Sequence, residues 1–170
     1  QEALQKACQS LEIKRNGLGA DGKEITDQDA ILYSLGNPSW DRLFHVRDAI
    51  SLGIPTKKIH AISNIDPWFL NQIEELVSIE KEISKFTVDT LTPELMREAK
   101  EKGFADRQVA HLVKCLESEI FTTRHKMNIK RVYKLVDTCA AEFEAKTPYY
   151  YSSFDGENES ESTDKEKVIV

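Results

Sequence analysis

Cysteine is scarce in this sequence, and the three cysteines, Cys8, Cys115 and Cys139, lie far apart. An odd number of widely spaced thiols fits neither a disulfide framework nor a zinc site of paired Cys-x-x-Cys ligands. No stretch approaches the roughly 20 consecutive apolar residues that a membrane span needs. The N-terminus also lacks a basic segment followed by an apolar one, which would mark a secretory signal. We therefore expect a soluble cytoplasmic protein with reduced thiols and no membrane partner.

Basic charge is not in excess either. The formal net charge is −6 at pH 7, and residues 155–170 carry most of it, with two lysines against six acidic residues. The remaining body is close to neutral. Proteins that bind nucleic-acid phosphates usually present a markedly basic face. The charge balance therefore argues against a nucleic-acid partner.

The sequence contains no G-x-S-x-G, P-loop or H-E-x-x-H motif. Gly17, Gly19 and Gly22 match G-x-G-x-x-G, but a dinucleotide site needs a strand before this motif, and here charged, helical-looking sequence precedes it. We interpret these glycines as a flexible connector. His111 and Cys115 share a helical face, yet they supply only two of the about four ligands that a structural metal needs. We thus predict no catalytic, cofactor-binding or metal-binding residue in this chain.

At 170 residues with 40% apolar side chains, the chain is long enough to build one core without disulfides or metals. Apolar residues recur at helical spacing along most of it. The expected fold is mainly α, a compact bundle of about six to eight helices with a short extended or β segment near the C-terminus. We predict helices over residues 1–13, 27–35, 41–52, 57–62, 66–86, 92–102, 106–113 and 117–127.

Several helix boundaries are indicated by local chemistry. Thr26, Asp66 and Thr92 can cap helix N-termini, and the latter two precede a proline at the first helical position. Gly53 and Gly103 suit the left-handed conformation that ends a helix. The helix from Asp66 has apolar residues around about half of its circumference, which predicts packing on two neighbours at once. These residues are Phe69, Leu70, Ile73, Leu76, Val77, Ile79 and Ile83.

The composition changes near the C-terminus. Residues 132–136 and 147–154 are rich in β-branched and aromatic side chains, which favours short strands. Residues 155–166 are acidic and serine-rich with almost no apolar content, so we expect a solvated linker there. The last residues, 167–170, predict the beginning of another strand.

A helix-turn-helix DNA-binding module is the main alternative function. The helices at 106–113 and 117–127 have suitable lengths, and basic residues including Arg124 and Lys126 form a cluster beside this pair. A recognition helix reads bases with its N-terminal turns. Here those turns carry Glu117 and Glu119, which phosphates would repel. The sequence therefore argues against DNA binding by these two helices.

Three stretches of the sequence together resemble the large chain of carbamoyl phosphate synthetases, which are ATP-grasp ligases. The first is Asn64-Ile65-Asp66-Pro67-Trp68-Phe69-Leu70, and the second is Lys102-Gly103-Phe104-Ala105-Asp106. The third is Val136-Asp137-Thr138-Cys139-Ala140-Ala141-Glu142-Phe143 followed by Thr147-Pro148-Tyr149-Tyr150-Tyr151-Ser152. The resemblance implies that the signature residues serve packing: Asp66, Trp68, Phe69, Gly103, Phe104, Asp137, Thr138, Cys139, Glu142 and Phe143.

The resemblance also implies a division of the chain. Residues 1–13 would end a preceding ATP-grasp half, residues 14–154 would form a helical oligomerisation domain, residues 155–166 an acidic linker, and residues 167–170 the first strand of the following half. The block itself would be a non-catalytic spacer. ATP and Mg or Mn would bind in the flanking halves. The partners would be those halves, other copies of the large subunit and a glutaminase small subunit, and the whole ligase would serve arginine and pyrimidine biosynthesis.

Overall fold

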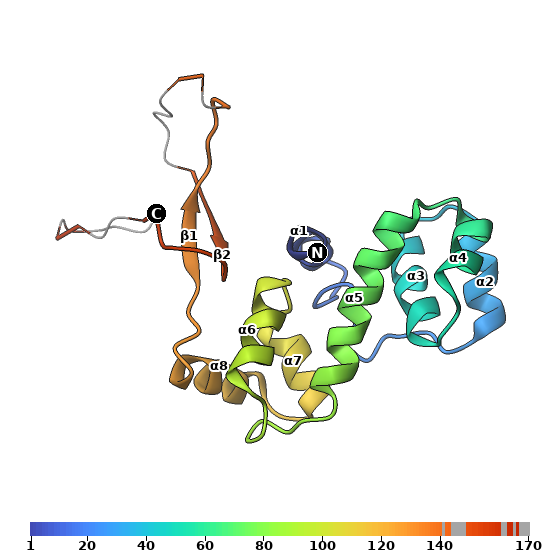
Figure 1. Ribbon diagram of the computed structural model, residues 1–170, viewed down its shortest axis with the longest axis horizontal. Helices are drawn as coiled ribbons and strands as arrows, with labels where there is room; N and C mark the ends of the chain where they lie inside the picture. The colour runs from blue at the N-terminus through green and yellow to red at the C-terminus, as the bar shows by residue number, and fades with distance from the viewer. Residues whose placement is uncertain (141, 144–148, 161–162, 165, 167–170) are drawn as a thin grey trace. The chain divides into compact units, whose positions relative to one another are not determined.

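The computed structural model divides into two compact units, Gln1–Ile129 and Lys130–Val170, which are described separately (Figure 1). It describes residues 1–140, 142–143, 149–160, 163–164 and 166. The strand expected at residues 167–170 lies outside the described residues. Within them, helices dominate and a short antiparallel hairpin lies near the C-terminus, so the predicted mainly α class is confirmed.

The first unit holds the helices. In chain order they are α1 (Glu2–Ser10), α2 (Gln28–Gly36), α3 (Arg42–Ser51), α4 (Thr56–Ser63), α5 (Pro67–Ile83), α6 (Pro93–Glu101), α7 (Asp106–Val113) and α8 (Glu117–Lys126). Each predicted helix is present, but α1 and α5 each end three residues early. After Ile83 the chain continues in tighter turns, in which the Phe86 N–H donates to the Ile83 carbonyl at 3.0 Å. Such turns commonly finish an α-helix.

Most predicted caps are confirmed. The Asp66 carboxylate accepts from the Trp68 N–H at 2.8 Å, and the Thr92 hydroxyl accepts from the Leu95 N–H at 3.3 Å. The predicted cap at Thr26 is wrong. Asp27 caps α2 instead, because its carboxylate accepts from the N–H groups of residues 29 and 30 at 3.0 and 3.2 Å. Aspartate is among the strongest N-cap residues, which explains why it takes this position.

The second unit contains strands β1 (Val132–Leu135) and β2 (Tyr150–Ser153), paired antiparallel with Val132 opposite Ser153. They fall inside the two predicted extended segments. The described beginning of the acidic segment is exposed and is hydrogen-bonded to β1, because Glu159 accepts from the Leu135 N–H at 2.7 Å and its own N–H donates to the Tyr133 carbonyl at 2.8 Å. Hydrogen bonding and Lys134 hold the pKa of the Glu159 carboxyl below its usual value.

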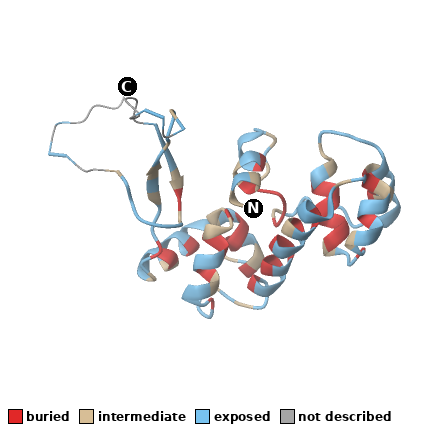
Figure 2. Cartoon of the chain, turned by 45° about the horizontal axis from the view of Figure 1, so that its top comes forward, coloured by how far each residue is buried: buried red, intermediate tan, exposed pale blue. Residues whose placement is uncertain are grey.

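Helix α5 lies at the centre of the first unit and contacts α3, α4 and α7, as its wide apolar surface predicted (Figure 1). Six of the seven predicted apolar residues are buried: Leu70, Ile73, Leu76, Val77, Ile79 and Ile83. Figure 2 shows buried residues concentrated on the facing sides of these helices. Phe69 differs, because its side chain is 57% exposed.

A repeat that was not predicted from the sequence relates α3, α4 and α5 to α6, α7 and α8. Gly53 and Gly103 have φ values of 81° and 88°, and Asn64 and Lys114, also fifty positions apart, have 56° and 59°. The burial class of each residue from 61 to 70 equals that of its counterpart from 111 to 120. The first unit therefore contains the same three-helix motif twice.

The glycine-bearing loop is not the flexible connector that we predicted. Gly17, Leu18, Gly19 and Ala20 are all buried, and Leu18 is only 1% exposed. The Leu18 N–H donates to Gln5 Oε1 at 2.8 Å, and the Gly19 carbonyl accepts from Gln108 Nε2 at 2.7 Å. The loop thus passes through the interior between α1 and α7, and its backbone groups are bonded to side chains there.

Glycine is required at positions 17 and 19 because side chains of other elements approach the loop backbone closely there. A Cβ on Gly17 would lie 2.3 Å from Gln5 Oε1, and a Cβ on Gly19 would lie 2.3 Å from Arg47 Nε. Both distances are shorter than any real Cβ contact. The G-x-G spacing therefore reflects packing against buried polar side chains, and this explains the motif without a nucleotide.

We predict that Gly19→Ala destabilises the protein by about 3 kcal/mol, because the new methyl group must displace a buried guanidinium that is held by an ion pair. Denaturant unfolding measures this difference. Gly36→Ala is the matched control. Its Cβ would meet Ile62 Cγ2 at an ordinary 3.6 Å. It should leave stability unchanged or raise it by up to about 1 kcal/mol, since alanine favours helix over glycine. Equal effects of the two changes would contradict the loop's interior position.

Candidate functional site

Three features of the first unit are candidates for a functional site: a buried charged cluster around Arg47, a second cluster around Asp106, and an apolar groove beside α5. All three lie among residues 1–129. The clusters are described first, because they contain the titratable groups that a catalytic site would use.

Arg47 on α3 is 5% exposed and lies among carboxylates. Its Nε and Nη2 both donate to Glu80 Oε2 on α5, and its Nη1 lies 3.0 Å from Asp48 Oδ1 and 3.7 Å from Glu24 Oε1. Asp48 also accepts from the Ile25 N–H at 2.9 Å. Burial opposes the charge on Arg47, but Glu80 and Asp48 outweigh it and raise its pKa. The cluster joins the loop, α3 and α5 through ion pairs.

Asp106, at the start of α7, forms the second cluster. Its carboxylate lies 2.8 Å from Lys100 Nζ and accepts from Arg124 Nε at 2.8 and 3.0 Å. Burial alone would raise the pKa of Asp106, but Lys100 and Arg124 hold it below its usual value. Arg124 Nη1 also donates to the Ile129 carbonyl at 3.3 Å. This cluster ties α6, α7 and α8 together.

The same contacts bear on the helix-turn-helix alternative. Arg124 is 5% exposed and is bound to Asp106, so it does not belong to a basic surface. At the start of α8, Glu119 accepts from the Leu116 N–H at 2.7 Å, and Glu117 pairs with Arg107 at 3.0 Å. The structure thus gives no support to DNA binding by α7 and α8.

The remaining candidate ligands do not converge. His111 is exposed and lies beside Gly22, where a Cβ would be 3.3 Å from its Cε1, and Cys115 is half-buried. Among the described residues, no group of three or more His, Cys, Asp or Glu side chains is placed to hold a metal ion. In the same part of the chain, no helix is both long and apolar enough to cross a membrane.

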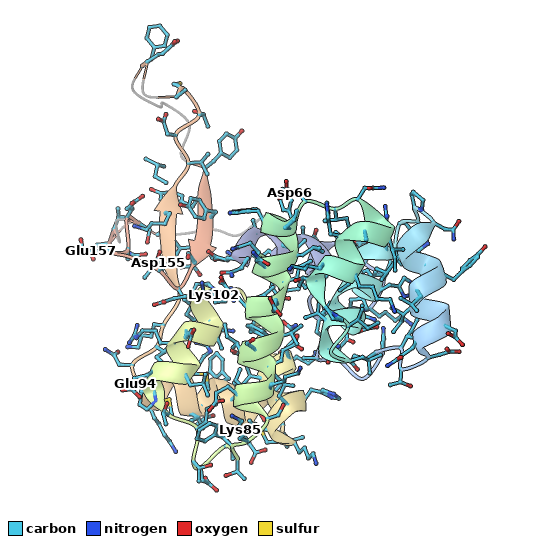
Figure 3. All side chains as sticks on the ribbon, turned by 45° about the vertical axis from the view of Figure 1, so that its right-hand side comes forward. Asp66, Lys85, Glu94, Lys102, Asp155 and Glu157 are labelled. Carbon is cyan, nitrogen blue, oxygen red and sulfur yellow. The ribbon has the colours of Figure 1, made fainter. Side chains whose placement is uncertain are left out.

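The signature residues of the first unit fall into two groups. Gly103 and Phe104 are buried, and the Phe104 N–H donates to the Ala99 carbonyl at 3.0 Å, closing the turn after α6. Asp66 caps α5 and is labelled at its N-terminal end in Figure 3. Trp68 and Phe69 are 60% and 57% exposed, on the outer side of the first turn of α5, and their packing role stays a prediction.

The signature residues of the second unit lie in the turn after β1. Asp137 accepts from the Cys139 N–H at 3.0 Å, and the Cys139 carbonyl accepts from the Glu142 N–H at 3.0 Å. The Thr138 hydroxyl lies 3.8 Å from the Cys139 sulfur. Phe143 is 75% exposed. These residues form a local turn, and their packing role stays a prediction.

An apolar groove of about 510 Å³ lies between α1, α3 and α5. Its walls include Ala3 and Leu4 from α1, Leu43 from α3, and Trp68 and Phe69 from α5. The two aromatic rings meet edge to face, with centroids 4.9 Å apart. Among the described residues that line it, none has a charged side chain. The sequence interpretation missed this groove because it assigned Phe69 to the core.

The first unit is thus a helical block with two buried charged clusters and an exposed apolar groove. Comparison with known proteins identifies its family. Residues 1–128 match the family described as "Carbamoyl-phosphate synthetase large chain, oligomerisation domain". This chain belongs to that family, as the three sequence stretches predicted.

Individual relatives agree with this assignment. The carbamoyl phosphate synthase large chain of Archaeoglobus fulgidus is 42% identical over the whole chain, and that of Synechocystis is 44% identical. The arginine-specific large chain of Arabidopsis thaliana, a chloroplastic protein, is 43% identical. The chain spans only 14–16% of the length of these relatives.

We predict that Asp106→Asn costs about 3–5 kcal/mol of stability, because it leaves two buried cations without their anion. Since the pKa of Asp106 is lowered in the folded state, its contribution is present above about pH 4 and is lost as the pH falls through the folded-state pKa. Unfolding curves at neutral and acidic pH measure both effects. The control, Glu117→Gln, removes an exposed ion pair and should cost less than about 1 kcal/mol. A similar loss in both variants would contradict this assignment.

We also predict that the chain does not bind Mg-ATP, because the backbone of the G-x-G loop is buried and bonded to Gln5 and Gln108. Isothermal titration calorimetry should show no saturable heat up to millimolar nucleotide. Stoichiometric binding in the micromolar range, abolished by a bulky residue at position 19, would restore the nucleotide-site interpretation.

Proposed function

We propose that this chain is the assembly and spacer block of a longer carbamoyl phosphate synthase large chain and has no catalytic site of its own. One observation supports this most directly. The match to the oligomerisation-domain family ends at residue 128, and the compact helical unit ends at Ile129. The family description therefore applies to one folded unit of this chain.

The full-length protein would synthesise carbamoyl phosphate from bicarbonate, two ATP and ammonia released from glutamine by a glutaminase small subunit. This proposal is supported by the names of the relatives, all of which are carbamoyl phosphate synthase large chains. ATP and Mg or Mn would bind in ATP-grasp halves outside these residues. The product would serve arginine and pyrimidine biosynthesis, and the enzyme would be cytoplasmic.

The construction of the first unit suits a spacer. Two reaction centres that exchange a labile intermediate must be held at a fixed separation, which requires a stiff connecting element. Here α5 packs against helices on more than one side, and the Arg47 and Asp106 clusters join neighbouring elements through buried ion pairs. Separating these elements would expose unpaired charges, which is strongly unfavourable. The unit is thus expected to move as one body.

Copies of the large chain would meet through exposed aromatic surface. Tyr33 on α2 and Trp40 in the following turn are each 74% exposed. Aromatic residues are enriched in protein interfaces, where large rings exclude water. Closed twofold dimers are the commonest soluble oligomers. We therefore propose that the α2 side of the unit contributes to contacts between copies.

Sedimentation equilibrium over a wide concentration range tests this proposal. The chain should associate weakly and saturate as a closed dimer, and Tyr33→Ser/Trp40→Ser should weaken the association. Leu116→Ser is the matched control. Leu116 is 68% exposed and directly precedes α8, so this change should leave the association unchanged. Open-ended aggregation would indicate nonspecific apolar surface. A monomer up to hundreds of micromolar would contradict oligomerisation by this block and leave only the spacer role.

A further inference from the structure

The groove beside α5 exposes an aromatic pair that the fold itself does not require. The internal repeat shows this directly. Trp68 and Phe69 occupy the positions that Ser118 and Glu119 occupy in the second motif, and all four are exposed. The same backbone therefore forms with polar residues at these two positions. At these two positions only the first motif carries aromatic rings, and we take this difference as a sign that another surface covers them; the second motif exposes a different ring, Phe121, elsewhere.

The groove is a built feature, because its α1 wall is fixed in place. The side-chain amide of Gln1 donates to Glu75 on α5, and Gln1 Oε1 accepts from Lys102 Nζ at 2.6 Å. Gln5, one turn later, is fully buried. Lys102 is labelled at the end of α6 in Figure 3. The first turn of α1 is thus held against two other helices, and the groove keeps its shape without an occupant.

The size of the groove limits what can fill it. It is lined by ten residues, whereas a stable contact between protein copies uses about 20–30 residues on each side. A volume of about 510 Å³ suits a few large apolar side chains from one short segment. A second copy would also lose translational and rotational freedom on binding, at a cost of several kcal/mol in general, whereas a tethered segment does not. The groove alone therefore fits a segment of the same polypeptide better than a second copy.

Gln1 lies at the edge of this groove. A polypeptide joined to Gln1 would leave the unit there and reach the groove with a very short loop, which costs little closure entropy. The relatives are about six to seven times longer than this chain, so most of the large chain lies outside these residues. We propose that the groove of Trp68 and Phe69 seats an apolar segment of the same large chain from outside residues 1–170. This rests on the proposal that the chain is part of a longer large chain, but not on self-association.

Hydroxyl-radical footprinting of the 170-residue chain and of the full-length large chain tests this inference. Trp68 and Trp40 are the only tryptophans of these 170 residues, which makes Trp40 an internal reference. Both samples are diluted until sedimentation shows monomers. The oxidation rate of Trp68 relative to Trp40 should fall several-fold in the full-length monomer. An unchanged ratio, or protection that appears only when the full-length chain associates, would overturn the proposal, and the second result would assign the groove to a second copy.

A double variant provides an independent test. Trp68→Ser/Phe69→Glu introduces the residues of the second motif at exposed positions, so the melting temperature of the 170-residue chain should change by no more than about 2 °C. The same double variant should lower the melting temperature of the full-length chain by clearly more. Tyr33→Ser/Trp40→Ser is the control and should lower the melting temperature of the monomeric full-length chain by much less. Equal changes in melting temperature in the short and full-length chains would contradict the binding of a segment in the groove. The outcome of this test is independent of the sedimentation experiment, because self-association can be absent while the groove still binds a segment of the same chain.

Discussion

The buried guanidinium of Arg47 is the constraint on which the arrangement of the first unit depends. It is almost inaccessible to water and is compensated by Glu80 from α5, Asp48 from its own helix and Glu24 from the loop. A buried charge is tolerated only when its partners stay in place. The loop must therefore pass close to the guanidinium, and Gly19 permits that approach. One side chain thus links the path of the loop to the packing of two helices.

Polar contacts of the same kind recur elsewhere in the unit. Gln5 and Gln108 bind the loop backbone from α1 and α7, and Asp106 binds cations from α6 and α8. Hydrogen bonds and ion pairs have directional requirements that apolar contacts lack. A core that combines both kinds of contact specifies one arrangement of its helices. This property suits an element that keeps other parts of an enzyme at fixed positions.

Comparing the two copies of the three-helix motif distinguishes residues that the fold requires from residues that it does not. Both copies share the left-handed residues that join their helices, and residues 61–70 have the same burial classes as residues 111–120. They differ at exposed positions, where the first copy carries Trp68 and Phe69 and the second carries Ser118 and Glu119. The core is only partly common to both copies, because Arg47 and Asp48 are buried whereas their counterparts Arg97 and Glu98 are exposed. The surfaces are individual, and the interaction surfaces of this family member are to be sought among those differences.

The sequence by itself determined the helices, most of their ends and the family. Helical spacing of apolar residues, caps such as Asp66 and left-handed glycines such as Gly53 act within a few residues, so they can be read locally. Tertiary structure alone decided the burial of the loop at Gly17 and Gly19, the pairing of Arg47 with Glu80, and the exposure of Phe69. Each depends on residues far apart in the chain, whose approach no local pattern encodes. The groove belongs to this second group, because its walls come from three helices that meet only in the folded chain.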